Sequence, residues 1–143
     1  MYKKIILAYD GSDSGQKAII ECKEMKFWND PEIYLLSVIA PYSSPVVDGG
    51  YLDLESNDKH IIHSQNQLDA GVELIKKEGL VCSGRLLIGN PVKEITQFAK
   101  NNSCNLIIVM HKHIDSVFKR WWANQPSVSI VEESPCNVLI VVS

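Results

Sequence analysis

The chain has 143 residues, of which 45% are hydrophobic and 22% are charged, and its formal net charge is -3. This length is typical of one compact domain with a core of its own, so we expect a single domain over residues 1–143. The slight acidity gives no electrostatic basis for binding nucleic acid, which requires clustered lysine and arginine. No apolar stretch approaches the roughly 20 residues that cross a bilayer, so we expect a soluble protein with no membrane partner.

The first predicted strand covers Tyr2 to Tyr9, a continuous apolar run of the kind buried in parallel sheets. Residues 10–13 combine a turn with the polar side chains that start helices. Apolar residues then recur at helical spacing as far as Trp28, and Asn29-Asp30-Pro31 ends the predicted helix. Ile33 to Ile39 follows as the second predicted strand.

A proline- and glycine-containing loop over residues 40–56 leads to the next helix. This helix is predicted from Asn57 to Gly79, and Val81 to Ile88 forms the third strand. Gly89-Asn90-Pro91 then starts a helix with proline in its first turn. The apolar stripe of the helix before Gly79 consists of Ile61, Ile62, Leu68, Gly71, Val72, Leu74 and Ile75.

The last part of the chain continues the alternation of strands and helices. Leu106 to Met110 is a fourth buried strand, residues 127–133 a short helix, and Val138 to Val142 the final strand. Strict alternation predicts an α/β fold with a doubly wound, five-stranded parallel sheet and helices on both faces. Ligands bind beyond the carboxyl ends of such strands, so the turns that follow the first four strands are the candidate site.

The four cysteines, Cys22, Cys82, Cys104 and Cys136, are widely spaced and form no C-x-x-C pair. No secretory leader precedes the first apolar run, so we expect a reducing, cytoplasmic location. Free cysteine is among the most buried residue types, and we expect all four to be small buried hydrophobic groups rather than redox groups.

Asp10 directly follows the first predicted strand and is the first candidate for ligand binding. A carboxylate at a strand tip can accept hydrogen bonds from ribose hydroxyls or from an adenine amino group. The same side chain could instead cap the turn and the helix that follows. Local sequence leaves both roles open.

The chain resembles universal stress proteins along essentially its whole length. Lys4 to Ser12 and Leu35 to Val38 look like the first two strands of that family. The turn 89–91, the strand 105–110 and the segment 134–141 are similar to its later landmarks, in the same order and spacing. The resemblance implies a Rossmann-like fold of the adenine nucleotide alpha hydrolase-like kind, which binds AMP, ADP or ATP.

The resemblance also implies which residues would hold such a nucleotide. Four residues near the ends of the first two strands would surround the base and the ribose, and residues after the third and fourth strands would complete the site. The candidate set is Ala8, Tyr9, Asp10, Val38, Gly89, Met110, His111, His113, Asn124, Gln125 and Ser127.

The phosphate half of this site departs from the family pattern. ATP-binding members carry Gly-x-x-Gly, nine residues and then Gly-Ser after the fourth strand, whereas His111, Ile114, Asn124 and Gln125 occupy those positions here. Isoleucine disfavours the positive φ that glycine allows, so we do not expect a tight triphosphate cradle. Asn124 tolerates left-handed φ, and the basic segment 111–120 could hold a mono- or diphosphate or could be a solvated loop.

Histidine and tryptophan residues form three further candidate groups. His111 and His113 have no neighbouring cysteine or carboxylate pair to complete a zinc site, so we expect no metal. His60 and His63 are expected on a polar helix surface. Trp121-Trp122 could pack over the sheet end, stack a base or contact a partner protein.

The sequence contains no serine-hydrolase elbow, P-loop or dinucleotide-binding glycine motif. We therefore predict a stress-response binding or regulatory module rather than an enzyme, with weak ATP hydrolysis as the enzyme-class alternative. The apolar strand Val138 to Val142 is expected at a sheet edge, where it could pair with a second copy. The family commonly pairs through this strand, so we expect a homodimer. The rival hypothesis is a nucleotide-independent homodimer that acts through protein contacts.

Overall fold

The computed structural model describes the chain except for residues 1, 10–12, 25–27, 40–53, 112–129 and 143. The described strands form one sheet in the order β3-β2-β1-β4-β5, and every neighbouring pair is parallel. The order reverses between β1 and β4, which confirms the predicted doubly wound fold. The strands are Tyr2–Ala8 (β1), Trp28–Ile39 (β2), Val81–Ile88 (β3), Leu106–His111 (β4) and Asn137–Val142 (β5).

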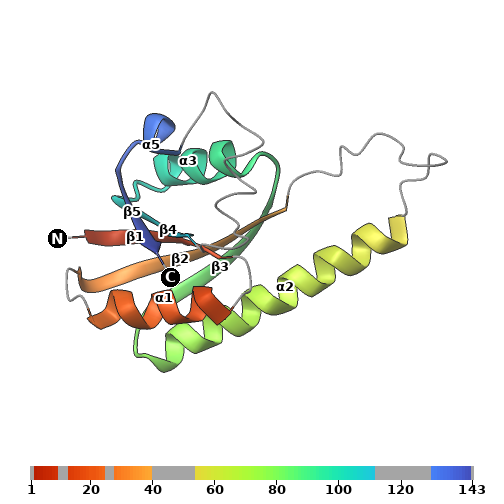
Figure 1. Ribbon diagram of the computed structural model, residues 1–143, viewed down its shortest axis with the longest axis horizontal. Helices are drawn as coiled ribbons and strands as arrows, with labels where there is room; N and C mark the ends of the chain where they lie inside the picture. Colours follow the sequence, from red (N-terminus) through yellow and green to blue (C-terminus); the bar gives the residue numbers. More distant parts are fainter. Residues whose placement is uncertain (1, 10–12, 25–27, 40–53, 112–129, 143) are drawn as a thin grey trace.

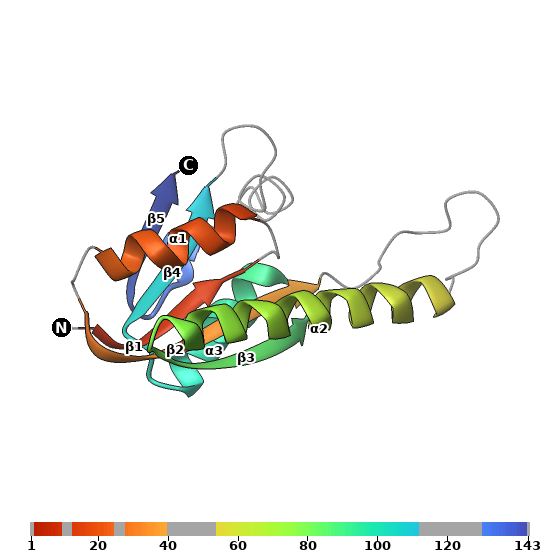
Figure 2. The same ribbon diagram turned by 90° about the horizontal axis from the view of Figure 1, so that it is seen from below.

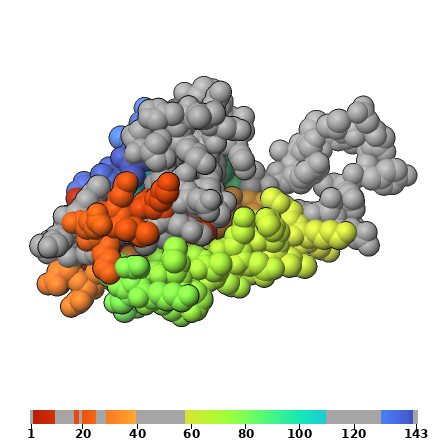
Figure 3. All heavy atoms as spheres, turned by 60° about the horizontal axis from the view of Figure 1, so that its bottom comes forward, coloured from red at the N-terminus to blue at the C-terminus, as the bar shows by residue number. Residues whose placement is uncertain are grey.

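Helices cover both faces of the sheet (Figure 1). The helices α1 (Asp13–Glu24) and α2 (Leu54–Lys77) pack on one face, and α3 (Pro91–Asn101) and α5 (Ile130–Glu133) pack on the other. Figure 3 shows α1 and the carboxyl-terminal half of α2 side by side on one surface. The Lys23 ammonium and the Glu78 carboxylate, 2.7 Å apart, join the ends of these two helices.

Alternation along β1 divides its side chains between two hydrophobic clusters. Ile5 and Leu7 pack under α1 and α2, whereas Ile6 and Ala8 pack under α3 and α5. Both faces of the strand are therefore buried, which explains why its sequence is continuously apolar instead of alternating.

β2 begins at Trp28 rather than at the predicted Ile33, and α1 ends at Glu24, so the prediction of a helix reaching Trp28 was wrong. The pairing with β1 shifts between Tyr2, which pairs with Trp28, and Lys4, which pairs with Glu32. Extra residues of β2 bulge out over this interval, and Asp30 there has a φ of 43°. A bulge accommodates proline, so Pro31 lies inside a central strand instead of ending a helix.

The helix α2 begins at Leu54, earlier than the predicted Asn57, and the chain leaves it at Gly79, whose φ is 82°. Its 24 residues span about 36 Å at 1.5 Å per residue, whereas the eight residues of β3 span roughly 26 Å. The amino-terminal turns of α2 consequently project past the sheet (Figures 1 and 2). Ile62, a member of the predicted apolar stripe, lies on this projecting part and is 59% exposed, while Leu68 and Ile75 of the same stripe are buried.

The other boundaries differ from the predictions by a few residues at most within the described part of the chain. β3 and the turn 89–91 agree with the prediction, and β4 extends one residue further, to His111. β5 begins at Asn137, and the short helix before it is described from Ile130.

Candidate functional site

The central strands end at different levels on the carboxyl edge of the sheet. Ala8, the last residue of β1, pairs with Leu36, but β2 continues to Ile39. On the other side Leu7 pairs with Ile108, and β4 continues to His111. At about 3.3 Å per residue, β2 and β4 therefore reach roughly 7–10 Å beyond the end of β1. We term residues 8–9, 37–39 and 109–111 the carboxyl rim.

Ala8 and Val38 are two predicted site residues in the apolar part of the rim. Both side chains face α3, because Ala8 belongs to the cluster under that helix and Val38 packs against the same cluster. Ala8 is buried and Val38 is half-buried. The structure therefore brings these two predicted site residues onto one face of neighbouring strands.

Tyr9 contributes its backbone to the rim. Its amide donates a hydrogen bond of 2.8 Å to the Leu36 carbonyl oxygen, which extends the pairing of β1 with β2 by one residue. Tyr9 as a whole is 2% exposed, and its side chain packs in the cluster under α1 and α2. The Tyr9 ring thus lies on the opposite face of the sheet from Ala8 and Val38, a separation that follows from alternation along the strand.

Gly89 joins the turn before α3 to the rim, because its amide donates a hydrogen bond of 2.9 Å to the Ile39 carbonyl oxygen. Asn90 caps α3 by accepting a 3.1 Å hydrogen bond from the Lys93 amide at its Oδ1 atom. The side chain of Glu94 lies over Gly89, where an added Cβ would come within 2.9 Å of the Glu94 Cγ atom. The Glu94 carboxylate, from the first turn of α3, therefore lies at the positive end of the same helix.

The other predicted site residues are placed only in part. Met110 and His111 belong to β4, where they pair with Val141 and Val142. The rest lie outside the described residues: Asp10, His113, Asn124, Gln125 and Ser127.

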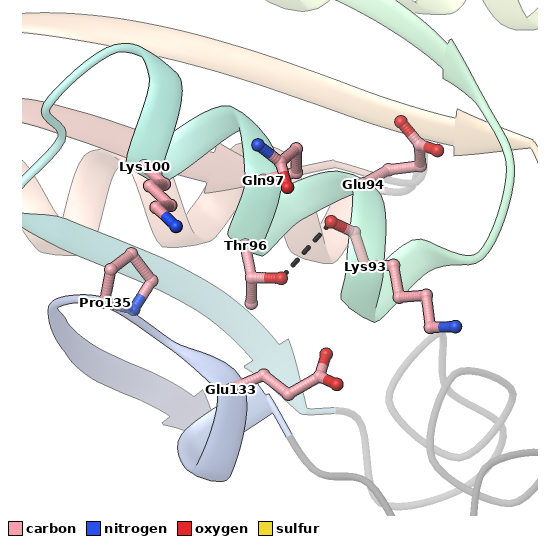
Figure 4. A pocket seen from close by; sticks show the side chains of 7 residues that line it. All are labelled: Lys93, Glu94, Thr96, Gln97, Lys100, Glu133 and Pro135. Carbon is pink, nitrogen blue, oxygen red and sulfur yellow. Dashed lines mark hydrogen bonds between the residues drawn. The ribbon is translucent and has the colours of Figure 1, made fainter.

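A groove of about 470 Å³ lies between α3 and the turn that joins α5 to β5 (Figure 4). Thr96 is buried, and its hydroxyl donates a 2.8 Å hydrogen bond to the Val92 carbonyl oxygen. No sequence motif pointed to this groove, because α3 and α5 are separated in the chain. Its lining mixes both signs of charge and consists of Lys93, Glu94, Thr96, Gln97, Lys100, Glu133 and Pro135.

The described residues were also compared with the requirements of a metal site and of a membrane-spanning helix. Among the described residues, no cluster of three or more histidine, cysteine or acidic side chains could hold a metal ion, and His60 and His63 are exposed. In the same part of the chain, no helix combines the length and the apolar character needed to span a membrane.

The strand order and the staggered rim define a doubly wound α/β protein whose candidate site lies at the point where the sheet reverses. The model of the universal stress protein family matches residues 1–142, so the chain belongs to that family. A universal stress protein of Thermus aquaticus is 29% identical over 147 residues, covering 99% of each chain. A universal stress protein of Methanocaldococcus jannaschii is 24% identical, covering 99% of this chain and 82% of its own.

Solved structures share the fold. The hypothetical protein MJ0577 aligns with a TM-score of 0.75 at 22% identity, covering 100% of this chain and 97% of its own. A universal stress protein of Archaeoglobus fulgidus in complex with dAMP aligns with a TM-score of 0.63 at 19% identity, covering 98% of each chain. A universal stress protein family member of Arabidopsis thaliana with AMP bound gives 0.61 at 19% identity, covering 98% of this chain and 91% of its own.

Proposed function

We propose that this protein is a stress-response regulatory module that binds an adenine nucleotide at the carboxyl rim. The observation that carries the proposal is the stagger of the rim, where β2 and β4 outreach the end of β1 at the reversal of the sheet. Ala8 and Val38 supply an apolar face for the base, and Asp10 supplies a carboxylate for the ribose. The relatives solved with AMP and dAMP support the same ligand class.

We further propose a nucleotide with one or two phosphates. Glu94 lies at the amino terminus of α3, where it repels a phosphate that would otherwise be attracted to that helix end. The substituted glycine positions at His111, Ile114, Asn124 and Gln125 weaken a backbone cradle on the side of β4. The Glu94 carboxylate and the substituted glycine positions both disfavour binding of a triphosphate more than binding of a mono- or diphosphate, because a triphosphate carries the largest negative charge.

Calorimetry tests the proposal on protein stripped of nucleotide. The protein is titrated with AMP, ADP and ATP, with and without Mg²⁺. We expect micromolar binding of AMP or ADP and weaker binding of ATP. Asp10→Ala should weaken binding at least tenfold, whereas Asp58→Ala, which removes an exposed carboxylate of α2, should leave it unchanged.

Two outcomes would contradict the proposal. The absence of heat up to millimolar nucleotide would remove nucleotide binding altogether. Equal losses in Asp10→Ala and Asp58→Ala would show that overall charge, rather than a carboxylate at the rim, controls binding.

A phosphate-release assay tests the enzyme-class alternative, weak ATP hydrolysis at this site. Phosphate release by the wild type that persists in Asp10→Ala would contradict hydrolysis at the rim, because the activity would then come from contamination or from another site.

The second candidate function is a nucleotide-independent homodimer that pairs through Val138 to Val142. β5 lies at an edge of the sheet, as predicted, and its backbone could pair with a second copy. Ile140 of β5 is 39% exposed, and Val131 of the neighbouring α5 is 62% exposed. These two apolar side chains favour burial against a partner at this edge.

A further inference from the structure

Two of the four cysteines lie at the amino ends of neighbouring strands. Cys104 precedes β4, Cys136 directly precedes β5, and the first residues of the two strands, Leu106 and Asn137, are paired. Both cysteine side chains pack in the hydrophobic cluster under α3 and α5. The other two, Cys22 and Cys82, belong to the cluster on the opposite face of the sheet.

The spacing of the strands brings Cys104 and Cys136 within reach of each other. Because Leu106 pairs with Asn137, Cys136 lies level with Asn105, one residue from Cys104 along the chain. With strands about 4.8 Å apart and a rise of about 3.3 Å per residue, the two Cα atoms lie roughly 6 Å apart, within the range of about 4.4–6.8 Å that a disulfide joins. Burial is the main cause that raises the pKa of the Cys104 thiol to about 11, and the neighbouring Cys136 contributes to the same rise. The Cys104 sulfur therefore lies in the electrostatic environment of Cys136.

Cys136 is the more accessible of the pair. It is half-buried, whereas the other three cysteines are buried, so the prediction that all four are buried was wrong for this residue. The Ser134 hydroxyl lies 3.7 Å from the Cys136 sulfur. Burial raises the pKa of the Cys136 thiol, and the contact with Ser134 opposes this rise only in part. The greater exposure of Cys136 therefore makes it the first of the two sulfurs that a peroxide in solution reaches.

We propose that Cys104 and Cys136 form an oxidation-sensitive pair that closes into a disulfide when the protein meets a peroxide. The Cys136 thiolate attacks one peroxide oxygen, the O–O bond breaks, and a sulfenic acid and hydroxide form. The Cys104 sulfur then attacks the Cys136 sulfur, the S–O bond breaks, and water leaves. In sum, two thiols and one hydrogen peroxide give one disulfide and two waters. A small thiol such as glutathione reverses the reaction by exchange.

Peptide mapping of the wild-type protein tests the pair directly. The reduced protein is treated with hydrogen peroxide, free thiols are alkylated, and the digest is analysed without reduction. We expect a peptide pair that joins Cys104 to Cys136 and an intact mass that is lower by two hydrogens. The rate should rise roughly tenfold per pH unit below the thiol pKa, because the thiolate is the nucleophile.

Matched variants separate this pair from the remaining cysteines. Cys136→Ser should abolish the cross-link, and Cys22→Ala, on the other face of the sheet, should leave its rate unchanged. A cross-link between other cysteines would overturn the proposal, as would oxidation of Cys136 to a sulfinic acid while Cys104 remains a free thiol. The wild-type peptide map decides between these outcomes even if a variant fails to fold.

Discussion

The ring of Tyr9 packs directly against the backbone of Gly71. A Cβ atom at position 71 would lie 2.8 Å from the Tyr9 Cε1 atom and 2.8 Å from the Leu35 Cδ2 atom. The helix α2 therefore approaches the sheet closely at this point because Gly71 has no side chain. The contact connects the position of α2 to the carboxyl end of β1, where the candidate site begins.

Gly71→Ala should destabilise the protein. Alanine favours a helix by about 1 kcal/mol over glycine, but overpacking a core costs about 1–3 kcal/mol, so we expect a net loss of about 1 kcal/mol. Urea unfolding measures this change. The control is Ala70→Gly, the reverse change at an exposed position of the same helix, which should lose about 1 kcal/mol through helix propensity alone. A Gly71→Ala protein more stable than the wild type would show that α2 moves outward without cost.

Asn90→Ala should remove the hydrogen bond that Oδ1 accepts from the Lys93 amide and should lower the free energy of unfolding by about 1 kcal/mol. Asn90→Asp should preserve most of the stability, because its carboxylate accepts the same bond at the positive end of α3. Chemical unfolding of the two variants provides the comparison. Equal losses in both would mean that the side-chain acceptor does not stabilise this helix end.

Stability should fall at alkaline pH because of the buried thiols of Cys22 and Cys82. Burial raises the pKa of each from 9.0 to about 11. Above pH 9 the unfolded chain loses these protons more readily than the folded protein, so the contribution of the two thiols to stability is constant below pH 9 and declines between pH 9 and 11. The decline is of order 3 kcal/mol per thiol at most.

Unfolding in reducing buffer at pH 8 and pH 10 measures this effect. Cys82→Ala should show a smaller difference between the two pH values than the wild type does. An unchanged difference would show that other groups, such as lysines and tyrosines, produce the alkaline decline.

Ile140→Lys should convert the proposed homodimer to a monomer, because it places a charge on the exposed apolar surface beside the β5 edge. Val81→Lys is the matched control on β3, the opposite edge strand, where Val81 is 69% exposed. Sedimentation equilibrium compares the two variants. Dissociation by Val81→Lys but not by Ile140→Lys would move the interface to β3, and a monomeric wild type would exclude the dimer.

Apolar runs and turn residues predicted most of the fold. The run from Ile5 to Ala8 was recognisable as a strand because both faces of β1 are buried. Trp28 was misassigned because it continued the helical spacing of α1 and preceded a proline, and neither signal reveals a bulge. Ile62 belongs to the predicted apolar stripe and yet is exposed, because periodicity shows which side of a helix is apolar but not how far the sheet beneath it extends.

The edge of the sheet that carries the candidate site was predictable from the sequence, but the packing of the side chains around it was not. The rule that ligands bind at the carboxyl ends of parallel strands indicated this edge of the sheet, and the family resemblance implied Ala8, Val38 and Gly89, which the structure does bring to that edge. It did not predict that the Tyr9 ring packs beneath α2, or that Glu94 lies over Gly89. Both contacts depend on how α2 and α3 pack, which local sequence does not encode.

Because α2 is longer than the sheet that it covers, hydrogen exchange should differ between the two halves of the helix. The half of the helix around Leu68 and Ile75 is held by the core, whereas His60, Ile62 and His63 on the projecting half are exposed. Fraying from the amino-terminal end breaks few contacts, so amides there should exchange through local opening of low free energy. Amides near Ile75 should exchange only when the sheet itself opens. The free energy of opening that controls exchange would then rise along α2, from a low value for local fraying at its amino-terminal end to the value for unfolding of the whole protein near Ile75.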